Sequence, residues 1–264
     1  MHNPLSGATR VYYIVGDPIA QVKSPAGVSE ALQKRGHNAY VMPAHVVPAH
    51  LETWLQGVSV ARNVDGIIIT VPHKFSAARL CATLSERAAF LGAANTLRRN
   101  TDGSWHGDMF DGLGMVAALS AGGCQVSGAR ALLIGGGGAG SAIAHALVMA
   151  GVKALAIHDD DAIRATALLE RLGALQHCPI LRGSRDADGF NLVVNATPAG
   201  MAPADPLPLL AETLKPAMTV ACVITAPATT PLIAAARAKG CNTVTGTQMF
   251  DQVRDLMLRF LLPC

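Results

Sequence analysis

Aromatic and charged residues are scarce in this sequence. Only 4% of its 264 residues are Phe, Trp or Tyr and 15% are charged, while half are hydrophobic. A chain so rich in apolar residues is not expected to be disordered, and it suits the buried strands of a parallel sheet. The formal net charge of +3 comes without any long run of Lys or Arg. We therefore expect no nucleic-acid partner.

The sequence also lacks the usual marks of a metal site, a signal peptide or a membrane anchor. Its six cysteines include no Cys-x-x-Cys pair and have no His at zinc-finger spacing, so we expect free thiols and no metal. The first ten residues have no apolar core, and the uncharged stretch 131–152 is interrupted by four consecutive glycines. These features predict a chain without a leader or a membrane span, located in the cytoplasm.

What is present is a succession of short apolar runs separated by Gly, Pro and polar clusters. In the first part of the chain these runs predict strands at 11–15, 39–42 and 66–71, helices at 24–34, 48–54, 75–80 and 85–91, and a hairpin over 96–106. Ser24 followed by Pro25 is typical of a helix N-cap and the first helical residue after it.

From residue 107 onward, strands and helices alternate regularly. The predicted strands are 131–134, 154–157, 191–195 and 218–223, and the predicted helices are 112–121, 138–150, 162–172, 230–239 and 248–262. Such alternation indicates an α/β fold with a parallel sheet. The change of pattern predicts two domains, one made of 1–106 with 245–264 and the other of 107–244.

A glycine-rich turn carries the strongest chemical signal. Gly135, Gly137 and Gly140 fit the pattern G-x-G-x-x-G, directly after one predicted strand and at the start of a helix. Glycines at these positions permit a tight turn and let backbone N–H groups approach a pyrophosphate at the helix N-terminus. The turn predicts dinucleotide binding, and the alternative is a strand-to-helix turn without a ligand.

Acidic residues follow the next predicted strand. Asp159, Asp160 and Asp161 lie at the distance from the glycine turn at which a carboxylate binds the hydroxyls of an adenosine ribose. They are equally suited to cap the helix that follows, because acids complement a helix N-terminus. By themselves Lys74, Asp111 and His73 carry little information, since single polar residues in loops are usually exposed or structural.

Six segments resemble the shikimate dehydrogenase family, in order and with the proper spacing. Residues 16–25 (GDPIAQVKSP) resemble its opening G-x-P-I-x-H-S-x-S-P, 70–74 (TVPHK) its T-V-P-x-K, 92–96 (GAANT) its G-A-x-N-T, and 107–112 (GDMFDG) its G-x-N-T-D-G. The glycine turn matches G-x-G-G-A/G, and 195–201 (NATPAGM) is close to N-A-T-P-x-G-M. Thr230-Pro231-Leu232 and Gly246-x-x-Met249 match the C-terminal part of the family.

The resemblance implies an N-terminal α/β catalytic domain, a doubly wound Rossmann domain and an active site in the cleft between them. It implies an oxidoreductase that moves a hydride between NAD and a secondary alcohol of a small cyclic hydroxy-acid related to shikimate or quinate. Lys74 and Asp111 fall on the catalytic pair, and Ser24, Thr70 and Asn95 on substrate-binding positions. Cofactor contacts fall on Gly135, Gly137, Gly138, Ala139, Gly140, Asp159, Asp161, Asn195, Thr197, Gly246 and Met249. A small-molecule substrate is the expected partner, and a homodimer is left open.

The acids also predict which dinucleotide is used. Family members that use NADP typically have Asn-Arg-Thr after this strand, whereas here His158 precedes three aspartates and the first Arg is Arg164. A carboxylate accepts hydrogen bonds from free ribose hydroxyls and repels a 2′-phosphate. The sequence therefore predicts NAD.

Several polar residues of the family are replaced by apolar ones. The first Ser of S-x-S is Val22, the Asn before V-T-V-P is Ile68, the Asn-Thr before the catalytic Asp is Met109-Phe110, and the late Tyr is Thr225. The family's Gln falls on Val253, and Gln252 lies one residue earlier, about 100° around a helix. These changes predict an altered substrate, with Gln252 as a questionable substitute contact.

Two other functions are alternatives. A catalytically idle NAD-binding sensor fits the loss of polar residues but not the retained Lys74 and Asp111. An enzyme similar to methylenetetrahydrofolate dehydrogenase would also join a Lys to a Rossmann domain, but the segments 16–25 and 107–112 argue against it.

Overall fold

The computed structural model describes residues 5–202 and 204–262. The chain divides into two compact units, Met1–Phe110 with Arg254–Cys264 and Asp111–Val253. The chain passes from the first unit to the second after Phe110, just before a helix, and returns to the first unit at Arg254, inside the last helix. Both changes of unit lie later in the chain than the predicted boundaries at 106 and 244, and the functions assigned to the two parts stay predictions.

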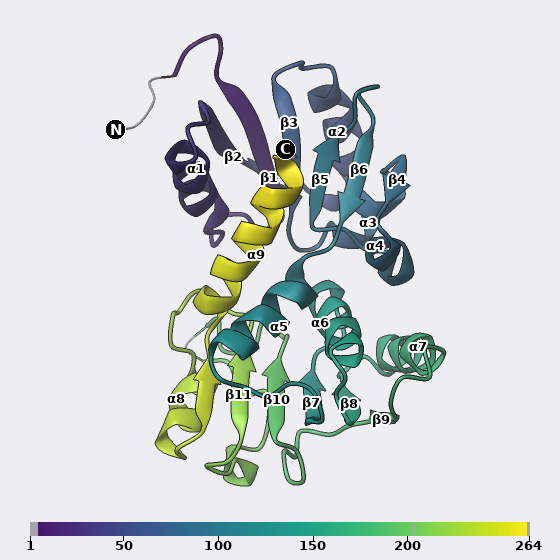
Figure 1. Cartoon of the computed structure of the whole chain (residues 1–264), viewed down its shortest axis with the longest axis vertical. Coiled ribbons are helices and arrows are strands. Elements are labelled where there is room, and N and C mark those ends of the chain that lie inside the picture. The colour runs from purple at the N-terminus through teal and green to yellow at the C-terminus, as the bar shows by residue number, and fades with distance from the viewer. Residues whose placement is uncertain (1–4, 203, 263–264) are drawn as a thin grey trace. The chain divides into compact units, whose positions relative to one another are not determined.

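The first unit contains six strands and the helices that flank them (Figure 1). Its elements are β1 (Arg10–Gly16), α1 (Ser24–Lys34), β2 (Ala39–His45), the 3-10 turn η1 (Pro48–His50), α2 (Leu51–Ser59), β3 (Val64–Ile69), α3 (Lys74–Arg79), β4 (Thr83–Leu84), α4 (Glu86–Leu91), β5 (Thr96–Arg99) and β6 (Trp105–Asp108).

These strands form one mixed sheet in the order β2-β1-β3-β5-β6-β4. β1 is parallel to β2 and to β3, β5 is antiparallel to β3 and to β6, and β4 is parallel to β6. β5 therefore starts at the edge of the sheet where β1, β3 and β6 end. β2 and β4 end there as well, so this edge gathers the loops after five strands and the loop before β5.

The apolar run of β3 is buried on both faces. Ile67 and Ile69 belong to a core cluster with Leu55 of α2 and Ala78 of α3. Because side chains alternate along a strand, Ile68 and the following Thr70 share the opposite face. A side chain on Gly66, also on that face, would overlap Leu261 near the end of the last helix.

The second unit alternates strands and helices (Figure 1). Its elements are α5 (Asp111–Ala121), β7 (Arg130–Ile134), α6 (Gly138–Met149), β8 (Ala154–His158), α7 (Ala162–Gly173), β9 (Ile180–Arg182), β10 (Leu192–Asn195), η2 (Ala211–Thr213), β11 (Thr219–Cys222), α8 (Pro231–Ala238) and β12 (Asn242–Val244), followed by α9 (Gly246–Leu261), which crosses into the first unit.

All strand pairs of the second sheet are parallel, in the order β12-β11-β10-β7-β8-β9. The chain starts in the middle with β7, runs outward through β8 and β9, and then crosses to β10 on the other side. This is the strand order of a dinucleotide-binding fold, and its switch point lies between β7 and β10. The predicted doubly wound parallel sheet is confirmed.

Most predicted elements are present, with three differences of detail. The N-cap of α1 is Lys23 rather than Ser24, and no side chain caps this helix. The short strands β4, β9 and β12 were not predicted, since two or three residues are too few to show a period. α9 begins at Gly246, two residues before the predicted start.

Two further expectations concern absences. None of the helices in the described part of the chain is long and apolar enough to cross a membrane. Within residues 5–202 and 204–262, no group of three or more His, Cys, Asp or Glu side chains could hold a metal ion.

Candidate active site

The edge of the first sheet brings Thr70 against the loop after β1. A Cβ on Gly16 would overlap the Cγ2 methyl of Thr70, so only glycine allows the two loops to approach this closely. The backbone N–H of Asp17 donates to the carbonyl of Val71 at 2.9 Å, and that of Thr70 donates to the carbonyl of Val15 at 2.9 Å. The first and second motifs of the sequence therefore form one surface.

Backbone hydrogen bonds connect the end of β3, next to Thr70, to the segments that contain Lys74 and Asn95. The N–H of Ile69 donates to the carbonyl of Asn95 at 2.7 Å, and the N–H of Ala94 donates to the carbonyl of Lys74 at 3.0 Å. Asn95 in turn donates its N–H to the carbonyl of Asp108 at 2.9 Å. Thr70, Lys74 and Asn95 thus lie at one edge. These bonds do not include Ser24, which is buried at the start of α1.

The Asn95 side chain is buried and serves the backbone around it. Its Oδ1 accepts hydrogen bonds from the N–H of Phe110 at 3.0 Å and from the hydroxyl of Thr96 at 3.1 Å. Asp111 follows Phe110 directly and is the first residue of α5. Asn95 therefore restrains the peptide that leads to Asp111.

Lys74 and His73 occupy different environments at the start of α3. Lys74 is the first residue of the helix and is partly exposed. His73 is 1% exposed, and its Nε2 lies 2.7 Å from the carbonyl oxygen of Val46. His73 is therefore a structural residue, and Lys74 is the partly exposed basic side chain of this pair.

The apolar replacements are packed side chains. Ile68 is 2% exposed on the face that it shares with Thr70, and Phe110 packs edge-on against Phe260 at 5.4 Å between ring centroids. Val253 stands at the position of the family's Gln. It packs so closely on Gly114 that a Cβ on Gly114 would overlap the Val253 side chain. Gln252 beside it is partly exposed.

Each glycine of the predicted G-x-G-x-x-G turn has its own spatial role. Gly135 has a φ of +97°, and a Cβ there would lie 2.7 Å from Thr197. A Cβ on Gly140 would overlap the carbonyl oxygen of Gly135. A Cβ on Gly137, the N-cap of α6, would meet nothing within 4 Å. The first and third glycines close the turn, and the second leaves space at the helix N-terminus, next to Gly138 and Ala139.

The loop after β10 packs on this turn at the switch point of the sheet. Asn195 is completely buried, and its Oδ1 accepts from the N–H of Thr197 at 3.0 Å and from the Thr197 hydroxyl at 2.7 Å. A Cβ on Gly140 would lie 3.3 Å from Ala196. The Asn195 side chain therefore shapes this loop.

Asp159 at the end of β8 is held by four hydrogen bonds. Its carboxylate, 4% exposed, accepts from the N–H groups of Gly136 (2.6 Å) and Asp161 (2.8 Å) and from Nε (2.9 Å) and Nη2 (2.7 Å) of Arg164. Burial would raise the pKa of Asp159, but the hydrogen bonds from Arg164, Gly136 and Asp161 outweigh it and lower the pKa to about 2. Asp159 is ionised and fixed beside the glycine turn.

The neighbouring acids have structural partners as well. Asp161 is the N-cap of α7, and its Oδ1 accepts from the N–H groups of Ile163 at 3.1 Å and Arg164 at 3.0 Å. Asp160 pairs with Arg185 at 3.0 Å. The helix-capping interpretation holds for Asp161, whereas Asp159 faces the glycine turn.

Gly246 and Met249 lie at the start of α9. A Cβ on Gly246 would overlap the carbonyl oxygen of Ile224, so this position requires glycine. Met249 is buried. Both residues are part of the second unit.

The family model of the shikimate dehydrogenase substrate binding domain matches residues 14–97. A shikimate dehydrogenase (NADP(+)) of Rubrobacter xylanophilus is 35% identical over 250 residues, which cover 93% of this chain and 88% of the relative. The chain belongs to the shikimate dehydrogenase family. The predicted family is confirmed, and the alternative based on methylenetetrahydrofolate dehydrogenase is set aside.

Solved structures of the family share the fold. The shikimate 5-dehydrogenase of Listeria monocytogenes, in complex with shikimate and NAD, is 26% identical with a TM-score of 0.87, covering 99% of this chain and 94% of that one. The quinate dehydrogenase of Corynebacterium glutamicum, in complex with NAD, is 28% identical with a TM-score of 0.87, covering 97% and 94%. These two structures contain NAD, whereas the Rubrobacter relative is named for NADP(+), so the relatives share a nicotinamide dinucleotide but differ in its 2′-phosphate.

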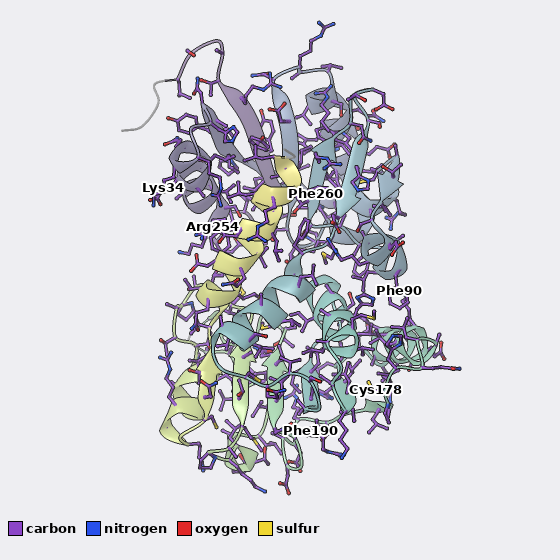
Figure 2. The ribbon with its side chains drawn as sticks, viewed as in Figure 1. Lys34, Phe90, Cys178, Phe190, Arg254 and Phe260 are labelled. Atoms are coloured by element: carbon purple, nitrogen blue, oxygen red, sulfur yellow. The ribbon has the colours of Figure 1, made fainter. Side chains whose placement is uncertain are left out.

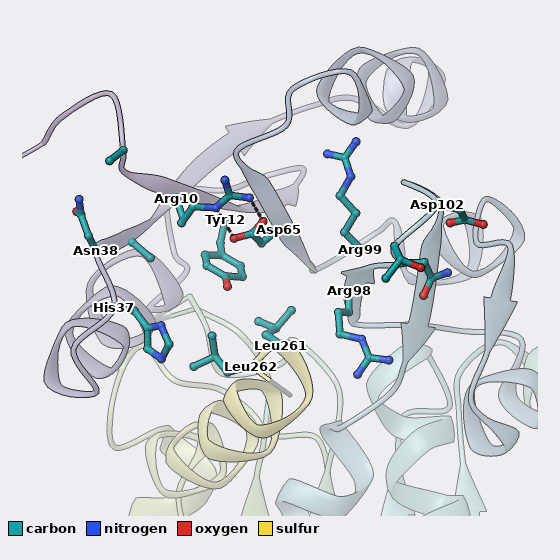
Figure 3. Close-up of a pocket in the computed structure, with 14 residues that line it drawn as sticks. Arg10, Tyr12, His37, Asn38, Asp65, Arg98, Arg99, Asp102, Leu261 and Leu262 are labelled. Carbon is teal, nitrogen blue, oxygen red and sulfur yellow. Dashed lines mark hydrogen bonds and ion pairs between the residues drawn. The ribbon is translucent and has the colours of Figure 1, made fainter. Parts of the chain in front are cut away.

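A separate pocket of about 860 Å³ opens at the opposite end of the first sheet (Figure 3). Arg10 and Asp65, near the starts of β1 and β3, form an ion pair there, and Arg98 comes from near the end of β5. None of the site residues expected from the family resemblance lines this pocket. Its Tyr12 points toward Leu261 and Leu262, and burial raises the pKa of Tyr12 to about 12.

Sequence reasoning missed two arginines. The pairing of Arg164 with Asp159 was not predicted, although Arg164 lies only five residues later, in the first turn of α7. Arg87 of α4 forms an ion pair with Asp108, three residues before Asp111. A buried carboxylate at the end of a strand requires a cation, but the sequence does not show which one.

Proposed function

We propose that this member of the shikimate dehydrogenase family is an NAD-dependent dehydrogenase. It would move a hydride between NAD and a secondary alcohol of a small cyclic hydroxy-acid related to shikimate or quinate. The observation that carries the proposal is the glycine turn at the switch point, in a chain that keeps Lys74 and Asp111 at the family's catalytic positions.

The residues at the turn fit a dinucleotide. The open space beside Gly137 and the N-terminus of α6 suit a pyrophosphate, because backbone N–H groups and the helix dipole both favour an anion there. Gly138, Ala139 and the Asn195–Thr197 loop border the same turn, and Asp159 would take the adenosine ribose. Gly246 and Met249 are further contacts implied by the family resemblance.

Lys74 and Asp111 would perform the proton transfer. When bound, the nicotinamide supplies the acceptor for the hydride that leaves the carbinol carbon. The hydroxyl proton of the same carbon passes to the Lys74 amine, leaving a ketone and an ammonium group. In the reverse direction Lys74 returns that proton to the forming alcohol. Asp111 would orient the amine by its negative charge.

The charges around Asp159 favour NAD over NADP. Three aspartates lie here, and the two arginines beside them are already paired, Arg164 with Asp159 and Arg185 with Asp160. A 2′-phosphate would face the Asp159 carboxylate and find no unpaired guanidinium among these two. At about 4 Å and an effective dielectric near 20, one such like-charge pair costs on the order of 4 kcal/mol before screening. Even a quarter of that favours NAD several-fold.

The ribose must share Asp159 with its present partners. A carboxylate has about four acceptor positions, and four hydrogen bonds already end on Asp159. The Arg164 side chain is 47% exposed and is the partner that can move away. We therefore infer that the ribose replaces one of the two Arg164 hydrogen bonds to Asp159, while the ion pairs with Asp159 and Asp161 keep the guanidinium engaged.

The substrate site favours a less polar ligand than shikimate. Ile68 and Val22 replace two hydrogen-bonding groups of the family, and each missing buried partner weakens binding by about 1–3 kcal/mol. Efficient enzymes reach a kcat/KM above roughly 10⁶ M⁻¹s⁻¹, and we expect the value for shikimate to lie below this range.

Two experiments test the proposed function. Turnover of shikimate, quinate and related cyclic hydroxy-acids is measured with NAD and with NADP, and activity on none of them would favour the catalytically idle sensor. Titration of both dinucleotides then tests the cofactor. Equal or tighter binding of NADP would contradict the choice of NAD.

A variant series locates the cofactor preference. The double substitution Asp159→Ala with Asp161→Ala should raise NADP affinity relative to NAD, because it removes two carboxylates and releases Arg164. Adding Arg164→Ala should cancel this gain, since the remaining arginine, Arg185, stays paired with Asp160. An unchanged NAD/NADP ratio in the double variant would show that the acids only cap α7.

A further inference from the structure

Arg87 of α4 contacts all three residues that precede Asp111. Its Nη2 forms an ion pair with the Asp108 carboxylate, and its Nε donates to the carbonyl of Met109 at 3.1 Å. Its guanidinium lies over the Phe110 ring, 5.0 Å from the centroid. One side chain therefore binds a carboxylate, a backbone carbonyl and an aromatic face of three consecutive residues.

These contacts extend into a stack in which two aromatic rings lie between two arginines. Phe110 packs against Phe260 of α9, which is labelled in Figure 2, with 5.4 Å between ring centroids. Arg98 lies over the Phe260 ring at 4.8 Å and donates to its carbonyl at 3.3 Å. The order Arg87, Phe110, Phe260, Arg98 joins α4, the end of β6, α9 and β5 within the first unit.

The segment held by Arg87 has further restraints at its polar atoms. The Asp108 carboxylate also accepts from the Ser85 hydroxyl and from the N–H of Met109 at 2.7 Å. Asn95 accepts from the N–H of Phe110 at 3.0 Å. Asp108 is almost completely buried, and a buried carboxylate is stable only with a paired cation. Arg87 supplies that cation and fixes the backbone at the same time.

We propose that Arg87 is a positioning residue for Asp111. It holds Asp108–Phe110 in one conformation and so fixes where α5 begins and where its first carboxylate is placed. The inference rests on the proposed function, since it takes Asp111 as a member of the catalytic pair. The apolar Met109 and Phe110 are then used as an anchor, with the Phe110 ring enclosed between Arg87 and Phe260.

The substitution Arg87→Lys separates positioning from simple stability. Lysine keeps a positive charge for Asp108 but has no Nε–H for the Met109 carbonyl and no planar group for the Phe110 ring. We expect kcat on the best substrate to fall about tenfold, with the KM for NAD unchanged and Tm within a few degrees of the parent. Arg98→Lys, the same change at the other end of the stack, should leave kcat within about twofold. Equal kcat values in Arg87→Lys and Arg98→Lys would overturn the proposal.

A double-mutant cycle with Asp111→Asn shows whether Arg87 acts through Asp111. In the Asp111→Asn background, Arg87→Lys should lower single-turnover rates by less than about twofold, because the group it positions is already disabled. A tenfold loss in both backgrounds would contradict positioning of Asp111. Full turnover by Asp111→Asn alone would instead overturn the proposed catalytic pair. An inactive Asp111→Asn with a fully active Arg87→Lys would overturn only the role of Arg87.

Discussion

The two units place their candidate sites in the same way but build them from different parts. In each, the site lies where parallel strands end, after β1 and β3 in the first sheet and after β7 and β10 in the second. The second site is shaped by backbone, since Gly135 and Gly140 are required by atoms of the chain itself. The first site depends on side chains of the segments that follow β3 and precede β5, among them Thr70, Lys74 and Asn95.

This difference explains which parts of the family pattern are retained. A turn made by backbone allows few changes, because a Cβ at Gly140 overlaps a carbonyl oxygen. A wall made by side chains can change its chemistry while the fold persists, as Ile68 shows by staying buried in β3. The cofactor site should therefore be sensitive to small substitutions, and the substrate site should be adjustable.

The largest effect is expected at Lys74. Lys74→Ala should lower kcat by roughly 10²–10⁴ with little change in NAD affinity, the range typical of a general acid or base. Steady-state kinetics and a dinucleotide titration measure the two quantities. Near-normal turnover by this variant would show that the proton is transferred by another group.

The glycine turn should separate stability from binding. Gly140→Ala should lower the free energy of unfolding by on the order of 3 kcal/mol and Tm by roughly 5–10 °C, because the overlap is between backbone atoms. Gly137→Ala should leave Tm unchanged, since its φ is −67° and its Cβ meets no atom within 4 Å. It should nevertheless weaken NAD binding at least tenfold, because the methyl group enters the space assigned to the pyrophosphate.

The two glycine variants are each other's control. Thermal unfolding and NAD titration are measured for both variants, so that the change in Tm and the change in NAD affinity can be compared. If Gly137→Ala binds NAD as tightly as the parent chain, the pyrophosphate does not lie against this turn.

Much of the fold could be predicted because its signals are local. The apolar run of β7, the glycines after it and the acids after β8 all lie within residues 131–161, so pattern and spacing suffice. The short strands β4, β9 and β12 are defined by pairing with neighbouring strands, and no local sequence pattern predicts them. The second change of unit inside α9 was also hidden, because one amphipathic helix continues through it.

The candidate site was less predictable wherever it depends on partners. The spacing after the glycine turn indicated Asp159 and Asp161, but the pairing of Asp159 with Arg164 and the cap formed by Asp161 arise only once α7 is folded. The contacts of Arg87 with Asp108–Phe110 join α4 to the end of β6. Such contacts depend on tertiary packing, which single motifs do not encode.

A medium-sized effect is expected for Asp159 at low pH. Its pKa is about 2 in the folded chain and 3.8 ordinarily, so its contribution to stability is present above pH 3.8 and is lost as pH falls toward 2. Asp159→Asn should remove up to about 2 kcal/mol of stability at neutral pH and much less at pH 2. Denaturant unfolding at the two pH values measures the difference. Asp186 is an aspartate in a separate loop, and Asp186→Asn is the control substitution. Equal losses at both pH values would contradict the ionic role.

The smallest effect is expected from restoring one polar group to the substrate site. Ile68→Asn places an amide on the face shared with Thr70, where the family has Asn and this chain has a buried apolar side chain. A new hydrogen bond to a polyol contributes about 1 kcal/mol, so kcat/KM for shikimate should rise roughly fivefold. The free energy of unfolding should fall by about 1–3 kcal/mol, because the amide is buried without its substrate partner. Ile68→Ala is the control, since it removes the same apolar contacts without adding a donor or acceptor, and it should not raise kcat/KM. A gain of the same size in both variants would mean that space rather than polarity limits shikimate, and the substrate site would then differ from the family's in volume instead of hydrogen bonding.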